Sequence, residues 1–291
     1  MTNVRIIERK GNKPGKTIVI LAGIHGNENC GVQAFDSIIP SLKIIAGKIY
    51  FVYANLAAIR KNKRFIEYDL NRCFLKKQSF EMKNSIEGKS AQDIIPYLNE
   101  ADVMLDIHAS YSQKSIPFVI CDKKWIREAR IFDAKIVSYN WDFFHQGSTD
   151  YYMNLQGKTG FCYECGYLGD PDANIIAEKA IFQFLKWAGS IDGGINQFYE
   201  QKIIEIKSLY KNSNEPFRKI KNFPDFFMLS KRDIIGYEGE KALYCEKGDI
   251  LIFVKDCESI GGECFLVGKE GKQKVNKILT SQSLKDLKER T

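Results

Sequence analysis

TIVILAGIHGNENC, residues 17–30, is the stretch that decides the fold, because an apolar run here ends abruptly in polar residues. Five of the six residues 17–22 are apolar, which predicts a buried strand, and Gly23 and Gly26 predict a tight turn at its end. Proteins with an α/β sheet bind their ligands at the carboxyl ends of such strands. We therefore expect an α/β fold whose functional site lies at this turn.

The turn carries two side chains that can bind a metal ion. His25 and Glu28 are three residues apart, so a helical turn would place them on one face. His108 ends a second apolar run, VMLDIH at residues 103–108, which predicts another strand ending at the same rim. Imidazole nitrogens and carboxylate oxygens are ordinary ligands of Zn²⁺, and three protein ligands with an open fourth position are typical of a catalytic zinc. We predict one Zn²⁺ per chain, held by His25, Glu28 and His108; the alternative for each histidine alone is a hydrogen-bonded core residue.

The composition is that of an ordinary globular protein of 291 residues, with 44% hydrophobic and 27% charged residues. The formal net charge is +7, but the lysines and arginines are scattered and no nucleic-acid-binding motif occurs, so we expect no nucleic-acid partner. Charged residues interrupt the N-terminal segment, and no window of about 18 apolar residues offers a membrane span. These features predict a cytoplasmic protein without a membrane partner, and they leave open whether it forms a homo-oligomer.

Eight cysteines in a chain of this length are compatible with reduced, buried thiols. Cys162 and Cys165 form a CxxC pair, which is found in redox sites and in zinc sites, but no second pair completes a four-cysteine zinc site. GFCYECG, residues 160–166, predicts a short strand on which Cys162 and Glu164 face one side and Tyr163 and Cys165 the other. We therefore expect the cysteines to pack in the interior and Glu164 to be the functional residue of this segment.

A second polar stretch, RKNKRFIEYDLNR at residues 60–72, combines many cations with Asp69, Asn71 and Arg72. A carboxylate such as Asp69 can accept the second N–H of a metal-bound histidine and so fix its tautomer. Asn71 and Arg72 can hold a substrate carboxylate, Arg72 through two parallel hydrogen bonds. We expect Lys61 and Lys63 in the same stretch to be solvated surface residues.

Four motifs in a fixed order carry a resemblance to a known family. HGNE, then NLAAIRKNKRFIEYDLNR, then DIH, then a glutamate between glycine turns together resemble the aspartoacylase and succinylglutamate desuccinylase family, which is related to zinc carboxypeptidases. The resemblance implies a role for each matching residue: His25, Glu28 and His108 bind zinc, Glu164 is the catalytic base and acid, Asp69 orients His25, Arg64 polarises the scissile carbonyl, and Asn71 with Arg72 holds the substrate carboxylate.

The same resemblance implies a carboxypeptidase-like mixed α/β sheet flanked by helices, followed by a small β-rich C-terminal domain. Short strands separated by turns from about residue 203 onward agree with such a second domain. We therefore expect a catalytic domain at residues 1–202 and a β-rich domain at residues 203–291. The segment SLKDLKER, residues 283–290, predicts a short surface helix near the end of the chain.

Two further positions bear on the substrate. Aspartoacylases of this family carry an additional arginine upstream of the catalytic glutamate, where this chain has Asn154, and the nearest cation in the stretch is Lys158. An acylated amino acid that is less acidic than N-acetylaspartate, or differently shaped, is therefore an equal expectation. His145 lies in an aromatic loop, and we expect it to pack against aromatic rings rather than to act as a lid over the site.

Together these residues predict a zinc-dependent hydrolase that cleaves the amide bond of a small N-acylated amino acid. One alternative is a zinc carboxypeptidase acting on a peptide or a cell-wall peptide, because Arg72 could equally hold a terminal carboxylate. Another is a zinc-binding protein without catalytic activity. The presence of both Glu164 and Arg64 favours an enzyme, since binding alone needs neither.

Overall fold

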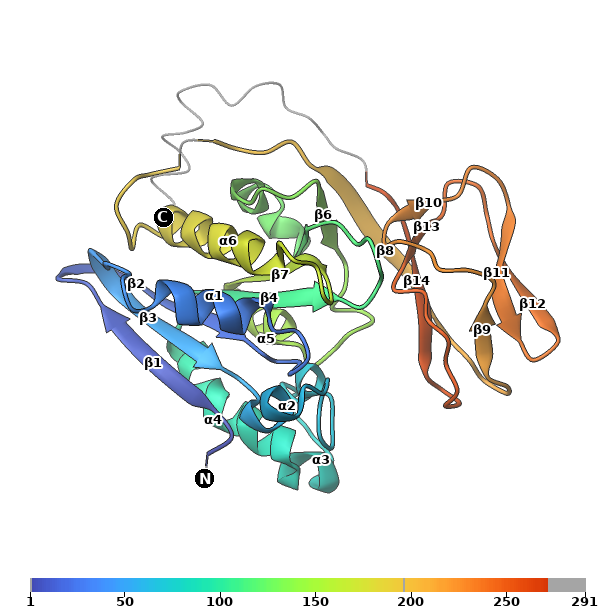
Figure 1. Ribbon diagram of the computed structural model, residues 1–291, viewed down its shortest axis with the longest axis horizontal. Helices are drawn as coiled ribbons and strands as arrows, with labels where there is room; N and C mark the ends of the chain where they lie inside the picture. Colours follow the sequence, from blue (N-terminus) through green and yellow to red (C-terminus); the bar gives the residue numbers. More distant parts are fainter. Residues whose placement is uncertain (1, 196, 272–291) are drawn as a thin grey trace.

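The computed structural model describes residues 2–195 and 197–271, and its centre is a mixed sheet of 11 strands (Figure 1). The strands of this sheet are, in chain order, β1 (Arg5–Lys10), β2 (Lys13–Ala22), β3 (Ala46–Tyr53), β4 (Val103–Ser110), β5 (Phe118–Cys121), β6 (Ile136–Tyr139), β7 (Thr159–Tyr167), β8 (Lys202–Lys211), β10 (Phe227–Met228), β13 (Ile250–Ile252) and β14 (Glu263–Glu270). Their order across the sheet is β1-β3-β2-β4-β7-β5-β6-β8-β14-β13-β10.

Helices cover both faces of the sheet. They are α1 (Cys30–Ile38), α2 (Leu56–Lys61), α3 (Phe80–Asn84), α4 (Ile86–Glu100), α5 (Thr149–Leu155) and α6 (Ala173–Trp187), with short 3-10 helices η1 (Leu70–Arg72), η2 (Lys123–Trp125) and η3 (Glu128–Ile131). The mixed α/β fold with flanking helices confirms the expected fold class.

Alternation along β2 assigns its side chains to the two halves of the core. Ile18 and Ile20 pack in the cluster that includes buried residues of α1 and α6, which lie together on one face (Figure 1). Val19 and Leu21 pack in the cluster that includes residues of α4 and α5, on the other face. Successive side chains of a strand point to opposite faces, so a strand covered on both sides is apolar at every position. This explains the uninterrupted apolar run in the sequence.

The strands β3, β2, β4 and β7 are parallel neighbours, so their carboxyl ends meet at one edge. In this register Ala22 of β2 is paired with Ile107 of β4, and His108 of β4 is paired with Glu164 of β7. Polar residues that follow the apolar runs are thereby delivered to the same edge of the sheet. The expected strands around residues 17–22, 103–108 and 160–166 are all present.

The C-terminal part is rich in strands and adds a second, 3-stranded sheet of β9 (Phe217–Lys219), β11 (Asp233–Glu238) and β12 (Lys241–Cys245). Strand β8 pairs in parallel with β6, and β14 then pairs antiparallel with β8, so the large sheet continues into this part of the chain (Figure 1). The boundary at residue 202 stays a prediction. The helix expected at residues 283–290 lies outside the described residues, and none of the helices described is long and apolar enough to cross a membrane.

Candidate metal centre and active site

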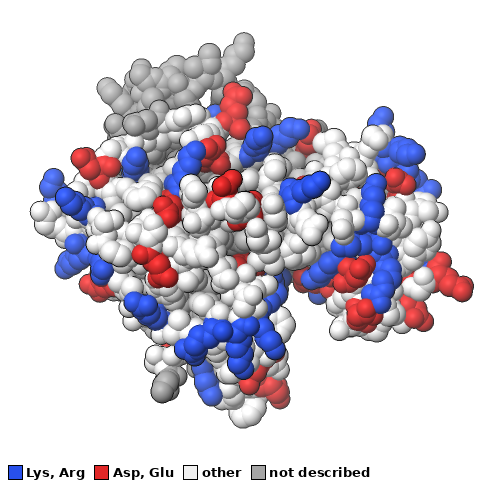
Figure 2. Space-filling model, viewed as in Figure 1, with Lys and Arg blue, Asp and Glu red and all other residues white. Residues whose placement is uncertain are grey.

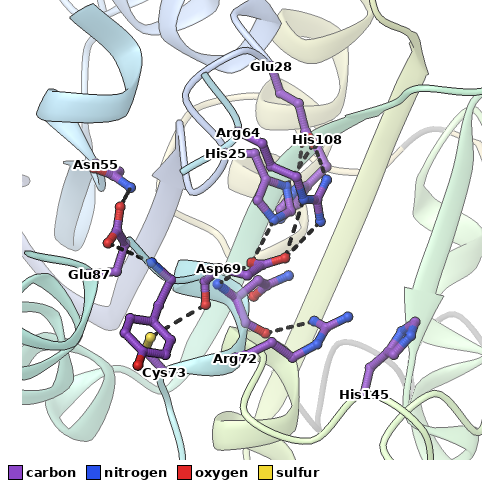
Figure 3. Close-up of polar contacts among 12 residues, drawn as sticks. His25, Glu28, Asn55, Arg64, Asp69, Arg72, Cys73, Glu87, His108 and His145 are labelled. Atoms are coloured by element: carbon purple, nitrogen blue, oxygen red, sulfur yellow. Dashed lines mark hydrogen bonds and ion pairs between the residues drawn. The ribbon is translucent and has the colours of Figure 1, made fainter. Parts of the chain in front are cut away.

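His25, Glu28 and His108 converge at the carboxyl ends of β2 and β4 (Figure 3). One ligand atom from each of the three lies within 4.8 Å of the others, and all three residues are buried. The Glu28 carboxylate is central: its Oε1 is 2.7 Å from His25 Nδ1, and its Oε2 is 2.8 Å from His108 Nδ1. The three residues predicted to bind zinc thus form one cluster of potential ligands.

Each histidine of the cluster is also held by a carboxylate on its other ring nitrogen. His25 Nε2 lies 3.0 Å from Asp69 Oδ1, and His108 Nε2 lies 3.1 Å from Asp106 Oδ2, the latter an ion-pair contact rather than an aligned hydrogen bond. Histidines that bind metals usually donate their second N–H to a carboxylate in this way. Both Nδ1 atoms therefore remain for an ion, and two imidazoles with one carboxylate fit a catalytic zinc site.

The electrostatics of the cluster keep Glu28 ionised. Burial by itself would raise the pKa of Glu28, but the neighbouring His25 and His108 outweigh it and hold that pKa below its ordinary value. A carboxylate must be deprotonated to bind a metal ion. Glu28 is therefore in the protonation state that a metal ligand requires.

Asp69 connects the cluster to the neighbouring cation Arg64. Its Oδ2 accepts hydrogen bonds from Arg64 Nε at 3.3 Å and Nη2 at 3.1 Å, while Arg64 Nη1 lies 3.4 Å from Glu28 Oε1. Its Oδ1 also accepts the backbone N–H of Asn71 at 2.9 Å and so caps η1. Burial opposes ionisation of Asp69, but His25 and Arg64 hold its pKa well below the usual range. One carboxylate therefore positions a histidine, an arginine and the short helix that carries Asn71.

Glu164 lines the pocket beside the cluster, on β7 next to His108. Its Oε2 is buried and has no hydrogen-bond partner among the residues that the structure describes. Burial raises the pKa of Glu164 well above its ordinary value, and the nearby Glu28 and Asp225 carboxylates add to the increase while His108 opposes it. A buried carboxyl with a raised pKa and a free oxygen is suited to accept and return a proton. On the opposite side of β7, Tyr163 and Cys165 pack in the core, as the strand pattern predicted.

The pocket lies between the edge of the parallel strands and the C-terminal strands. Figure 2 shows the surface hollowed between the body of the molecule and the β-rich part at the right, with charged side chains at the rim. The polar part of its lining includes Asn71, Arg72, His145, Lys255 and Glu263. The apolar part of its lining includes Ile120, Trp141, Leu209, Phe253, Phe265 and Leu266. Residues predicted from four separate stretches of sequence therefore share a pocket with residues of the last 90 positions.

His145 packs as the sequence led us to expect and also has a place in the pocket. It does pack against an aromatic ring, that of Trp141, with centroids 5.5 Å apart, but it also lines the pocket. Its Nε2 lies 3.1 Å from Glu263 Oε2, and the same oxygen is 3.7 Å from Arg72 Nη2. Burial favours the neutral form of Glu263, but His145 and Arg72 outweigh it and lower the pKa of Glu263 to about 2. The contact between His145 and Glu263 was not foreseeable from the sequence because 118 positions separate the two residues.

Glu87 is a buried residue that the sequence gave no reason to select. Its carboxylate accepts three backbone N–H groups of the loop between α2 and η1, from Ile66 at 2.7 Å, Glu67 at 3.2 Å and Tyr68 at 3.1 Å. It also accepts the side-chain amide of Asn55 at 3.1 Å (Figure 3). This loop carries the arginine and the aspartate that flank the metal cluster. Glu87, in the first turn of α4, therefore holds the loop in place.

Replacing Glu87 by Gln should destabilise the protein, because an N–H₂ group would then face backbone N–H groups that need an acceptor. A buried donor left without a partner costs about 1–3 kcal/mol. We expect a lower midpoint of thermal unfolding for Glu87→Gln, together with reduced zinc affinity as the loop loosens. Glu240→Gln is the matched control, since Glu240 is exposed. Equal midpoints in the two variants would contradict a role for Glu87 in holding the loop.

Two other buried acids were also missed. Asp106 is fully buried on β4, two residues before His108 and hence on the same side of the strand, and it accepts the hydroxyl of Thr149 at 2.6 Å. Asp225 accepts the hydroxyl of Ser110 at 2.6 Å and the backbone N–H of Phe253 at 2.8 Å. Asp106 could have been found from the sequence, because it is the aspartate of the DIH motif. Asp225 joins the end of β4 to the C-terminal part, and no sequence motif points to it.

The position where the aspartoacylases carry an arginine does not supply a cation to this pocket. The side-chain amide of Asn154 donates to Asp142 at 3.0 Å. The ammonium of Lys158 donates to the backbone carbonyls of Asn99 at 2.6 Å and Leu98 at 3.3 Å. Neither residue lines the pocket that contains the metal cluster.

Comparison with known proteins finds similar sequences and a similar fold. A family model of the succinylglutamate desuccinylase/aspartoacylase catalytic domain matches residues 14–186. A probable aspartoacylase from Prochlorococcus marinus (strain NATL2A) is 25% identical over 289 residues, covering 82% of this chain and 92% of that protein. A succinylglutamate desuccinylase from Pseudoalteromonas atlantica is 35% identical over 88 residues, which are 28% of this chain and only 25% of that relative. The solved structure of a succinylglutamate desuccinylase/aspartoacylase from Rhodobacter sphaeroides has the same fold, with a TM-score of 0.72 at 16% identity, covering 92% of this chain and 89% of that one.

Proposed function

Because this chain belongs to the succinylglutamate desuccinylase/aspartoacylase family, we propose that it is a zinc-dependent hydrolase that cleaves the amide bond of a small N-acylated amino acid. The observation that carries the proposal is the cluster of His25, Glu28 and His108, with ligand atoms within 4.8 Å of one another, in the same pocket as Glu164. The products are a carboxylic acid and a free amino acid.

His25, Glu28 and His108 would hold the zinc ion, with the ring orientations set by Asp69 and Asp106. Zinc in such a site supplies Lewis acidity and makes water acidic enough to attack near pH 7. The chain's own contribution is to fix three ligands in one place, with a carboxylate beside the second ring nitrogen of each histidine.

Glu164 is the proposed proton carrier. It takes a proton from the attacking water and returns it to the leaving amine, a role worth about 10²–10⁴-fold in rate. Its unpaired Oε2 and its burial support this assignment. Arg64, whose guanidinium lies against the metal cluster, would donate to the carbonyl oxygen as negative charge develops on it.

Asn71 and Arg72 are the proposed holders of the substrate carboxylate. Both line the pocket, and Arg72 Nη1 is kept in place by a hydrogen bond to the carbonyl of Asn71 at 2.8 Å. A carboxylate fixed at this point aligns the adjacent amide for attack. The entropic cost of orienting the substrate is then met when it binds, which lowers the barrier of the chemical step.

A panel of N-acetyl, N-formyl and N-succinyl amino acids, assayed with zinc-loaded and metal-stripped protein, tests the proposal. We expect release of free amino acid from at least one class with the zinc-loaded protein, and loss of that activity after treatment with a chelator, restored by added zinc. A panel that includes short peptides separates this function from that of a carboxypeptidase. Hydrolysis of peptides alone, or of no compound in the panel, would overturn the proposal.

The C-terminal strands favour a small substrate over a peptide. We propose that residues 1–202 form the catalytic domain and that residues 203–291 form a second domain that narrows its pocket. Leu209, Phe253 and Leu266 line the pocket directly, and Tyr111 donates its hydroxyl to the carbonyl of Phe253 at 2.6 Å. In this proposal these residues leave less room for a peptide than for a small substrate.

A further inference from the structure

Lys255 places an ammonium group in the pocket that contains the metal cluster. The residue follows β13 and is partly buried, and its Nζ lies 5.4 Å from the centroid of the Tyr111 ring. Within residues 2–195 and 197–271, no carboxylate lies within ion-pair distance of this ammonium, and no side chain or carbonyl accepts a hydrogen bond from it. The pocket therefore contains a cation that has lost part of its hydration without gaining an anionic partner.

The two arginines of the pocket differ from Lys255 in this respect. Arg64 is paired with Asp69 at 3.1 Å and approaches Glu28 at 3.4 Å. Arg72 approaches Glu263 at 3.7 Å. Of the pocket cations in the described part of the chain, Lys255 is thus the one whose charge is left for a ligand.

The surroundings of Lys255 are unfavourable for a charge in the absence of a ligand. Burial lowers the pKa of Lys255 below its ordinary value; the negative charge of Glu263 opposes this, and the positive charge of Arg64 adds to the decrease. Burying a charge without a partner costs free energy, and such groups are concentrated at functional sites. A carboxylate bound beside Lys255 would remove this cost.

We propose that Lys255 binds a second anionic group of the substrate, so that the substrate carries two negative charges. This inference rests on the proposed function, in which Arg72 and Asn71 hold the first carboxylate. The second charge belongs either to the side chain of the amino acid or to the end of the acyl group. Lys255 then determines specificity from the C-terminal part of the chain, where the position of Asn154 supplies no cation.

Paired substrates that differ in one charge test the proposal and distinguish its two sources. N-acetylaspartate with N-acetylasparagine varies the amino acid side chain, and N-succinylalanine with its succinamide analogue varies the end of the acyl group. In Lys255→Met we expect kcat/KM for the charged member of one pair to fall about 10- to 100-fold, mainly through KM, as a hydrogen bond between charged groups is lost. The uncharged member should change little. Lys255→Arg should retain part of the preference.

The matched control is Lys247→Met, because Lys247 is an exposed lysine of the same region. Its kinetics should equal those of the wild type, and the two Met variants should share one thermal midpoint. Equal loss for the charged and uncharged members of both pairs, or no loss for either, would overturn the proposal.

A binding measurement separates this inference from the proposed function. Calorimetry on the zinc-loaded wild type should show tighter binding of succinate than of butyrate, and Lys255→Met should abolish that difference. If no N-acyl amino acid is hydrolysed but the difference depends on Lys255, the proposed function fails while the anion site stands. If the substrates are hydrolysed but succinate binds Lys255→Met as it binds the wild type, the anion site fails and the function stands.

Discussion

Glu164→Gln is expected to lower kcat by about 10²–10⁴-fold while zinc remains bound. The amide of glutamine fills the same space on β7 but cannot accept a proton from water or return it to the leaving amine. Because Glu164 is not among the three residues whose ligand atoms converge, the metal content of the variant should equal that of the wild type. A large loss of rate without loss of metal is the signature of a proton carrier.

The measurement combines steady-state kinetics on the best substrate of the panel with zinc analysis of the same preparation. Glu240→Gln serves as the matched control, since it makes the same chemical change at an exposed position. KM should change less than kcat, because the role of Glu164 is realised in the transition state. Wild-type turnover by Glu164→Gln would remove this residue from the mechanism.

Glu28→Gln is expected to have the second large effect, on metal binding itself. The substitution replaces the carboxylate that lies between His25 Nδ1 at 2.7 Å and His108 Nδ1 at 2.8 Å with a neutral amide. Removing an outer partner of a metal ligand typically costs about 10–100-fold in metal affinity, so losing a charged ligand should cost at least that much. Activity should fall with zinc content.

Competition with a chromogenic chelator measures the loss. Asp69→Asn is the comparison, because it leaves all three ligands in place and removes only the charge of the carboxylate that faces His25. We expect zinc affinity to decrease in the order wild type, Asp69→Asn, Glu28→Gln. Full zinc binding by Glu28→Gln in the presence of the chelator would refute the ligand set.

The binding site for a second negative charge shows how the C-terminal part of the chain changes the chemistry of the pocket. Arg72 contacts Glu263 on β14, and Lys255 follows β13, so the anion partner of one pocket cation and the whole of another come from beyond residue 202. The catalytic motifs alone would describe a site for a single carboxylate. The charge preference of the enzyme is therefore predicted to depend on residues outside the family's catalytic domain.

The sequence alone determined the parts of the site that follow from local pattern. Apolar runs identified β2 and β4, and parallel strands must end at one edge, so the polar residues at their ends had to meet there. Alternation along a strand likewise placed Glu164 on the opposite side from Cys165. These inferences succeeded because the spacing of residues within one strand is set by backbone geometry.

Only the tertiary structure decided which distant groups complete the site. Glu87 reaches a loop about twenty positions earlier, Glu263 reaches His145 across 118 positions, and Lys255 enters the pocket from beyond β13. A hydrogen bond or an ion pair between distant residues leaves no periodic signal, because it depends on how separate elements pack and not on the geometry of either one. Whether a buried charge has a partner is likewise a property of the assembled pocket, and it is this property that distinguishes Lys255 from other lysines in the chain.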